Sequence, residues 1–116
     1  MIGGIGVDVV DIPRFAKSLE RTSSLSARLF LPGEAALSLE SRAGRFAAKE
    51  AFAKALKAPK GMAWHDIEVV TDERGAPSFV LHGGAADRCA ELGVTSLHLS
   101  ISHDTTVATA FVVAEC

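Results

Sequence analysis

Cysteine is scarce in this sequence, and its scarcity limits how the chain can be stabilised. Cys89 and Cys116 are the only two cysteines among 116 residues, and neither belongs to a CxxC pair. Two thiols cannot build a disulfide framework. We therefore expect reduced thiols and a cytoplasmic protein that depends on its hydrophobic core.

Long apolar runs and a strong net charge are also missing. No stretch approaches the roughly 18 apolar residues of a membrane span, and no basic segment followed by an apolar one marks a secretory signal at the N-terminus. The formal net charge is −2, so the overall charge gives no reason to expect nucleic-acid binding. We expect neither a membrane nor a nucleic acid as a partner.

What the chain does contain is an ordinary globular composition with unevenly distributed charge. Hydrophobic residues make up 48% of the sequence and charged residues 22%, which is too apolar for a disordered chain. At this length we expect one domain, residues 1–116, with a modest core. Between residues 14 and 60, ten lysines and arginines stand against four glutamates. This excess suits an acidic partner or a phosphate-rich ligand.

The pattern of apolar, turn-forming and capping residues predicts an α+β protein. Asp11 before Ile12 and Pro13 is a helix-start signature. The expected strands are 2–10, 66–70, 77–81, 96–102 and 107–113, with a turn at 72–75. The expected helices are 12–22, 23–30 (ended by Pro32 and Gly33), 34–39, 41–57 and 84–92. Because crossover helices do not alternate with the strands, we expect a mostly antiparallel sheet packed on a long helix.

The segment 41–57 is the most strongly predicted helix. Alanine recurs throughout it, and Pro59 and Gly61 follow its end. At 100° per residue, one face is the expected core face, and its residues are Ala48, Phe52, Ala55 and Leu56. The opposite face carries Phe46, Glu50, Lys54 and Lys57.

The opening Gly4-Ile5-Gly6 suggests a dinucleotide-binding loop, but the pattern is incomplete. The third glycine position holds Val9 or a neighbour, and no helix follows directly from the turn. We therefore reject this interpretation.

Asp8 and Glu50 are the candidate functional carboxylates. An unpaired carboxylate buried in the apolar strand around Asp8 would cost on the order of several kcal/mol, so Asp8 must face water, pair with a cation or bind a metal. Glu50 taken alone is half of an ordinary i, i+4 pair with Lys54. Together the two carboxylates could hold magnesium, which usually takes one or two carboxylates plus substrate phosphates. This favours phosphoryl-type chemistry without proving it.

His103 follows Ser102 near the turn between the last two strands. A histidine beside hydroxyl groups at a strand end can bind a phosphate or transfer a proton. Most histidines in such turns do neither, and a Ser-His neighbour pair is not a catalytic arrangement by itself. The role of His103 stays open on this evidence.

Several short motifs, in order and at suitable spacing, resemble one known family over nearly the whole chain. The segment Gly6-Val7-Asp8-Val9-Val10-Asp11-Ile12 is similar to the first motif of the bacterial acyl-carrier-protein-synthase branch of the 4′-phosphopantetheinyl transferases. The segment Arg45-Phe46-Ala47-Ala48-Lys49-Glu50-Ala51 resembles the second, a helix centred on Lys-Glu-Ala. Asp66-Ile67-Glu68-Val69-Val70 and Leu99-Ser100-Ile101-Ser102-His103 resemble the middle hairpin and the final strand.

The resemblance implies magnesium-dependent transfer of 4′-phosphopantetheine from coenzyme A to a serine of an apo acyl carrier protein, in fatty acid biosynthesis. It also implies a homotrimer with each active site between two subunits. Asp8 and Glu50 would bind Mg²⁺ and, with Lys54, form the catalytic set. The residues implied to bind coenzyme A are Arg45, Phe46, Lys49, Lys54, Gly61, Pro77, Ser102 and His103. Arg14 and Arg21 would contact the carrier protein.

Two other classes of function remain open on the sequence. A carrier-binding module without activity would keep the basic face but would not need Asp8 and Glu50. A magnesium-dependent hydrolase of nucleotides or phosphate esters would keep the metal but act without a carrier protein. For the transferase, Glu50 is the first candidate for the base that accepts the serine proton, and Asp8 is the second.

Overall fold

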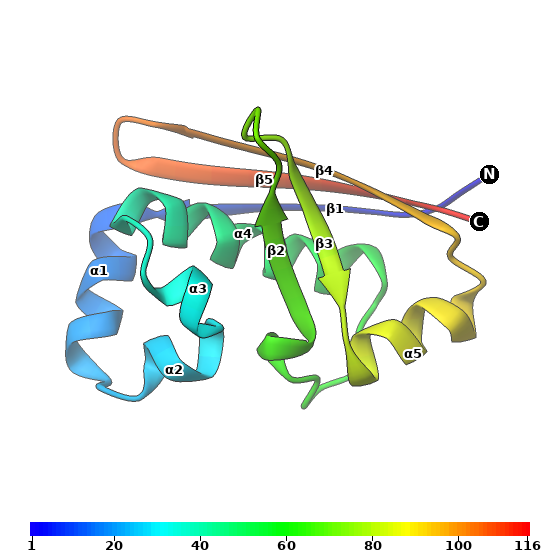
Figure 1. Ribbon diagram of the computed structural model, residues 1–116, viewed down its shortest axis with the longest axis horizontal. Coiled ribbons are helices and arrows are strands. Elements are labelled where there is room, and N and C mark those ends of the chain that lie inside the picture. Colours follow the sequence, from blue (N-terminus) through cyan, green and yellow to red (C-terminus); the bar gives the residue numbers. More distant parts are fainter.

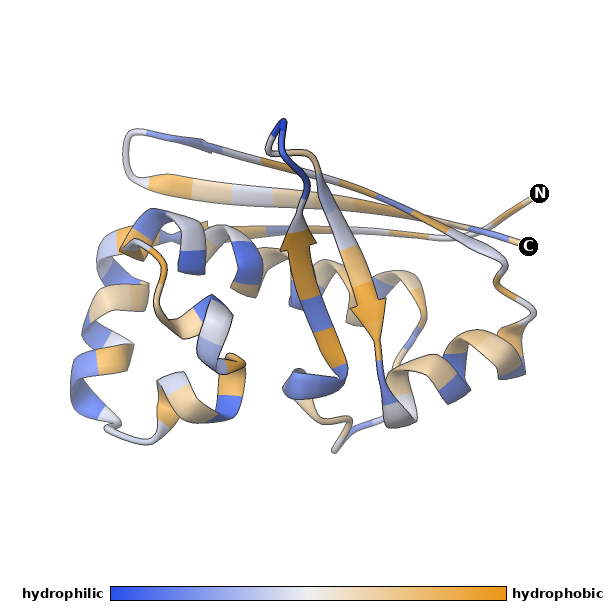
Figure 2. Ribbon diagram, in the orientation of Figure 1, coloured by the Kyte–Doolittle hydropathy of each residue, from blue (hydrophilic) through white to orange (hydrophobic).

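A three-stranded antiparallel sheet has the N-terminal strand, β1 (Ile2–Asp11), at one edge. The computed structural model describes residues 1–116. Strand β5 (Val107–Glu115) pairs with β1 on one side and with β4 (Ser96–Asp104) on the other, so the order is β1-β5-β4. Strands β2 (Ile67–Thr71) and β3 (Pro77–Leu81) form a separate antiparallel hairpin, whose turn is hydrophilic (Figure 2). The predicted α+β class with an antiparallel sheet is confirmed.

The long helix α4 (Leu39–Ala55) lies between the three-stranded sheet and the hairpin (Figure 1). Three short helices gather at one end of the molecule: α1 (Ile12–Arg21), α2 (Leu25–Leu29) and α3 (Pro32–Ala35). Helix α5 (Gly83–Leu92) lies at the other end, and a single 3₁₀ turn, η1 (Trp64–Asp66), leads into β2. None of the helices combines the length and the apolar character that a membrane crossing requires.

Capping side chains decide where the helices begin. Asp11 caps α1 as predicted, because its carboxylate accepts a hydrogen bond from the backbone N–H of Arg14 at 3.0 Å. The Ser38 hydroxyl accepts one from the N–H of Ser41 at 3.2 Å, so α4 begins two residues earlier than expected. Helix α4 ends at Ala55, because the backbone of Lys57 turns left-handed at φ 46°.

Pro32 begins a helix, which corrects the prediction that it ends one. Helix α2 is already over at Leu29, and Pro32 is the first residue of α3. A proline has no N–H to donate and is well tolerated in the first helical turn. The expected helix over 34–39 is not formed, because α3 stops at Ala35 and Ser38 caps the next helix.

Small residues let α4 and β1 approach closely. The predicted core face of α4 is fully buried at Ala48, Phe52, Ala55 and Leu56. A Cβ added to Gly4 would lie 1.9 Å from the carbonyl oxygen of Ala55, and one added to Gly6 would lie 1.9 Å from that of Ala51. The glycines at the start of the chain therefore serve helix–sheet packing.

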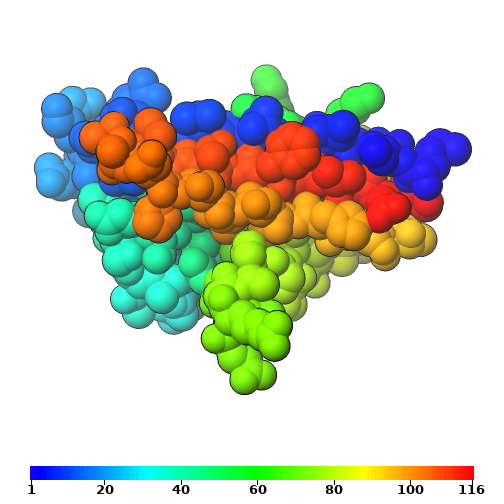
Figure 3. Space-filling model, turned by 90° about the horizontal axis from the view of Figure 1, so that it is seen from above, coloured from blue at the N-terminus to red at the C-terminus, as the bar shows by residue number.

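The outer face of the three-stranded sheet is apolar and no helix covers it. Figure 3 views this face, with β1, β5 and β4 side by side. Ile5, Val7 and Val9 on β1 are 50–61% exposed, and Phe111 on β5 is 45% exposed. An apolar surface of this kind on a stable protein is typical of a contact with another chain.

Candidate functional site

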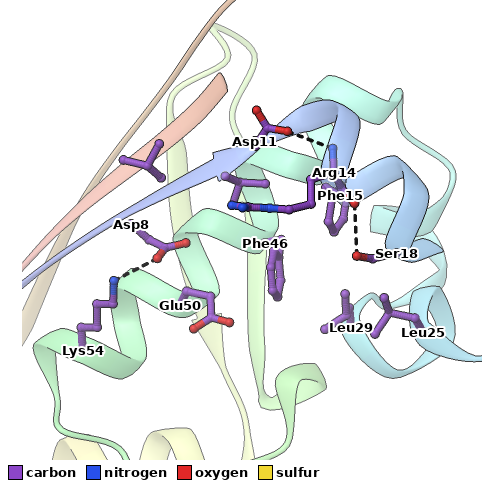
Figure 4. A pocket seen from close by; sticks show the side chains of 12 residues that line it. Asp8, Asp11, Arg14, Phe15, Ser18, Leu25, Leu29, Phe46, Glu50 and Lys54 are labelled. Atoms are coloured by element: carbon purple, nitrogen blue, oxygen red, sulfur yellow. Dashed lines mark hydrogen bonds and ion pairs between the residues drawn. The ribbon is translucent and has the colours of Figure 1, made fainter. Parts of the chain in front are cut away.

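Asp8, Glu50 and Lys54 meet where β1 crosses α4 (Figure 4). Asp8 shares the inner face of β1 with Gly6, and the close approach at Gly6 carries its carboxylate to the helix. Glu50 and Lys54 lie one turn apart on α4. The Nζ of Lys54 lies 2.9 Å from Oδ1 of Asp8 and donates to the carbonyl of Val7 at 3.0 Å. The structure thus brings the two candidate carboxylates together with a lysine.

The charges in this cluster do not balance. Burial raises the pKa of Glu50, the negative charge of Asp8 raises it further, and Lys54 opposes both effects. Two carboxylates share one ammonium group, and the Asp8 side chain is only 17% exposed. A partly buried excess of negative charge on oxygen ligands fits a hard cation. No group of three or more metal-ligating side chains exists in the chain, so such a cation must take further ligands from water or substrate.

A cavity of about 530 Å³ opens beside these carboxylates. Its other end is apolar and is lined by Phe15, Leu25, Leu29 and Phe46. The rings of Phe15 and Phe46 stack with centroids 5.3 Å apart. Phe46 was expected to bind coenzyme A, whereas Phe15, Leu25 and Leu29 were not predicted from the sequence. They come from the short helices α1 and α2, and no motif in the sequence signals how those helices pack on α4.

A second cleft, of about 210 Å³, lies on the far side of α4, toward β4. Arg45, Pro77 and His103 line it, together with Thr71 and Gly75. The Nε of Arg45 is buried without a hydrogen-bond partner. Burial lowers the pKa of Arg45, although the charge of Glu34 opposes the shift. An unpaired buried donor is destabilising.

Ser102 precedes His103 on β4 and is exposed. Successive residues of a strand point to opposite faces of the sheet, so Ser102 does not share this cleft with His103. The structure thus gathers three of the residues expected to bind coenzyme A around the second cleft: Arg45, Pro77 and His103. Thr71 was missed because a threonine at the end of a strand carries no signal of its own.

Lys49 reaches neither cavity. Its Nζ is fully buried and donates to Oε1 of Glu34 at 2.9 Å, to the carbonyl of Ile67 at 2.7 Å and to that of Trp64 at 3.1 Å. Burial lowers the pKa of Lys49, and Glu34 opposes the shift. All three ammonium protons already have partners in this chain. The expected contact of Lys49 with coenzyme phosphates does not fit this geometry, and we do not carry it into the proposed site.

The remaining predicted residues lie on the surface. Gly61 is in the exposed loop between α4 and η1, with φ 89°, and lines neither cavity. Arg14 borders the first cavity from the first turn of α1, whereas Arg21 is the last residue of that helix. Seven residues, or about two turns, separate them, so both arginines project from one side of α1.

Comparisons with known proteins point to a single family. The family model described as the 4′-phosphopantetheinyl transferase superfamily matches residues 4–112. A holo-acyl-carrier-protein synthase from Clavibacter michiganensis is 59% identical over 115 residues, 99% of this chain and 97% of the relative. The crystal structure of the Neisseria meningitidis holo-acyl-carrier-protein synthase is 32% identical, covers 100% of both chains and superposes with a TM-score of 0.90. The Helicobacter pylori synthase, solved in complex with coenzyme A, is 34% identical over 96% of this chain and 99% of its own, with a TM-score of 0.84.

Proposed function

The chain belongs to the 4′-phosphopantetheinyl transferase superfamily, and we propose that it transfers 4′-phosphopantetheine from coenzyme A to a serine of an apo acyl carrier protein. The products are holo acyl carrier protein and adenosine 3′,5′-bisphosphate. The observation that carries the proposal is the convergence of Asp8, Glu50 and Lys54 at one end of a cavity. Relatives over the full length are named as synthases of this kind, and one is solved with coenzyme A.

Magnesium is the metal that fits Asp8 and Glu50, because the site offers only carboxylate oxygens and leaves ligand positions for phosphates. When bound there, the ion would neutralise the charge that develops on the pyrophosphate. Lys54 is placed to stabilise the leaving phosphate. The serine oxygen forms a bond to the β-phosphorus while the bond to the bridging pyrophosphate oxygen breaks.

Glu50 is the group that accepts the serine proton in this proposal. Its raised pKa makes it a stronger base than an ordinary glutamate. Asp8 is the second candidate, because its carboxylate is already paired with Lys54.

The two halves of the proposed site lie on opposite edges of the sheet, which favours a shared site in a homotrimer. The carboxylates stand at β1, whereas His103 and Ser102 belong to β4, and the order is β1-β5-β4. A head-to-tail contact that brings the β4 edge of one copy to the β1 edge of the next would complete the site, and such contacts form a ring when the rotation between copies closes. The exposed apolar face of the sheet supplies surface for this contact.

Disrupting the apolar sheet face should separate the copies. We expect three chains per particle in sedimentation equilibrium, and a single chain after Ile5→Asp, because a carboxylate cannot be buried there without a partner. Transfer activity should be lost with the trimer. The control is Val80→Asp, which changes an exposed valine on β3, outside this face. A wild-type monomer that is fully active would contradict the shared site.

Arg14 and Arg21 provide the basic side of α1 for docking of an acidic carrier protein. Arg14→Glu should raise the KM for carrier protein by about tenfold or more, because charge reversal at an interface adds repulsion to the lost attraction, and should leave the KM for coenzyme A within about twofold. Steady-state kinetics with each substrate varied in turn makes the comparison. The control is Arg74→Glu, which reverses the same charge in the exposed hairpin turn, far from α1 in the sequence. It should leave the KM for carrier protein unchanged. Equal changes in both KM values would exclude the docking role.

The reaction itself is tested by intact-mass analysis of apo acyl carrier protein after incubation with this chain, coenzyme A and magnesium, beside an EDTA control. One phosphopantetheine adduct per carrier, dependent on magnesium, establishes the transferase. A binding module would leave the carrier mass unchanged, and a hydrolase would consume coenzyme A without a carrier protein. We place the reaction in the cytoplasm and in fatty acid biosynthesis, and the two free thiols, Cys89 and Cys116, fit a reducing compartment.

A further inference from the structure

Helix α4 ends in a turn that normally requires glycine. The N–H of Ala58 donates to the carbonyl of Ala53 at 2.9 Å, and that of Lys57 lies 3.4 Å from the carbonyl of Lys54. This is the hydrogen-bond pattern of a left-handed helix terminus, where the turning residue is usually glycine. Here the turning residue is Lys57, at φ 46°. A side chain in this conformation is strained, so the turn needs support from elsewhere.

Arg88 of α5 supplies that support. Its Nε donates to the carbonyl of Leu56 at 3.1 Å, and its Nη2 donates to that of Lys57 at 3.0 Å. These carbonyls stand at the negative end of α4, where a cation is favoured. The Arg88 side chain is 23% exposed, and its bond to the carbonyl of Leu56 is partly buried. The bond of Nη2 to Lys57 and the contact of Nη1 with Glu91, at 3.3 Å, lie at the surface.

The turn that Arg88 holds is basic and adjoins the catalytic face of α4. The segment 57–61 begins three residues after Lys54 and contains Lys57, Lys60 and Gly61. Neither lysine forms an ion pair within the chain, and both are exposed. Helix α4 ends at Ala55 and the backbone turns left-handed at Lys57, so the turn 57–61 leaves α4 at the end of the helix that carries Lys54. Two free ammonium groups beside this face are suited to the phosphates of a substrate.

We propose that Arg88 is a positioning residue for coenzyme A: through the carbonyls of Leu56 and Lys57 it holds the basic turn 57–61 where the phosphates of the coenzyme bind. Arg88 itself touches no substrate. The proposal rests on the proposed transferase function for the identity of the ligand. The hydrogen bonds from Arg88 to the end of α4 are the observation that Arg88 keeps this turn ordered.

Arg88→Met tests the proposal, because it keeps an apolar stem and removes both donors. We expect the KM for coenzyme A to rise about tenfold, in line with the loss of hydrogen bonds from a charged group. The kcat and the KM for carrier protein should stay within about twofold. Amide hydrogen exchange at 57–61 should become at least about tenfold faster, while β5 remains protected.

Arg88→Lys keeps one charged donor, so it should restore part of the affinity for coenzyme A and part of the protection at 57–61. Glu91→Ala leaves both carbonyl bonds intact and should behave as wild type.

Two results would overturn the proposal. One is unchanged exchange at 57–61 in Arg88→Met. The other is an equal decline of kcat and of both KM values with faster exchange throughout the chain, as general destabilisation predicts. If the wild type transfers nothing, the transferase assignment fails, and calorimetry with coenzyme A still decides the role of Arg88. A tenfold weaker affinity in a folded Arg88→Met protein supports it, and an unchanged affinity refutes it.

Discussion

Glu50→Gln is expected to lower kcat/KM for transfer by about 10²–10³-fold, because it removes both a metal ligand and the proposed base while keeping the shape of the side chain. Asp8→Asn should cause a loss of similar size and also weaken the contact with Lys54. Raising the magnesium concentration should recover part of the activity of Asp8→Asn, in which Glu50 still binds metal. Glu73→Gln, in the exposed hairpin turn, is the control. Full activity in either site variant would contradict the assignment of Asp8 and Glu50 as magnesium ligands.

The same Glu50→Gln change should stabilise the metal-free protein at neutral pH. Burial and the charge of Asp8 raise the pKa of Glu50 above its ordinary value of 4.5, so the folded state binds this proton more tightly than the unfolded state does. The stability contributed by protonated Glu50 is therefore complete below pH 4.5 and is lost as pH rises through the folded-state pKa. Glutamine carries no charge at any pH and avoids this loss.

Thermal unfolding in EDTA at several pH values tests whether Glu50→Gln raises or lowers the stability of the protein. The Tm of Glu50→Gln should exceed that of the wild type most at pH 7, and the difference should shrink toward pH 4. A variant that gains stability while it loses activity is expected at a site where function keeps charges in an unfavourable place. A wild type that is the more stable of the two at pH 7 would contradict the buried, charge-crowded environment of Glu50.

Local patterns in the sequence predicted those parts of the fold that depend on neighbouring residues. The period of α4 identified its buried face. The turn at 72–75 forms as expected, because Asp72 accepts hydrogen bonds from the N–H groups of Arg74 and Ala76, and Gly75 takes φ 81°. Pro32 was misjudged because a proline both follows helix ends and begins helices, and only the hydrogen bonding around it distinguishes the two.

The candidate site was predictable only in part, because its geometry depends on contacts between distant segments. No local pattern shows that Gly6 brings Asp8 onto α4, or that α1 and α2 close the apolar end of the cavity. The separation of the site into two halves follows from the strand order, which places β4 and β1 at opposite edges. Motif matching brought Asp8, Glu50 and His103 to attention, yet the motifs contain no information about which edge each residue occupies.

The environment of Lys49 is the feature that the local sequence pattern predicted least well. By helical period Lys49 stands beside the buried face of α4, where a lysine is usually assumed to extend its ammonium group to water. Its partner Glu34 is 15 residues away. The Glu34 carboxylate also accepts hydrogen bonds from the N–H groups of Leu31 at 3.0 Å and Val69 at 3.1 Å. The pair therefore joins α3, α4 and β2 in one buried network.

Lys49→Met is expected to destabilise the chain by about 3–5 kcal/mol, because it leaves the Glu34 carboxylate buried without its counter-ion. A protein of this kind has a total stability of about 5–15 kcal/mol, so the variant should be marginally folded in urea titrations. Lys49→Met combined with Glu34→Gln should recover much of the loss, since no buried charge remains and the amide oxygen can still accept a backbone hydrogen bond. Lys17→Met, on the exposed side of α1, should have little effect.

The double variant also separates the two roles assigned to Lys49. If Lys49 only joins the elements around it, the folded double variant should keep a KM for coenzyme A within about twofold of the wild type. If Lys49 leaves Glu34 to bind a phosphate, that KM should rise about tenfold or more even where folding is restored, because a charge-assisted hydrogen bond to the substrate is gone. Since three protein oxygens already surround Nζ within 3.1 Å, releasing the ammonium group would leave the buried Glu34 carboxylate without its counter-ion and would remove a donor from two carbonyls. The structure therefore favours the first outcome.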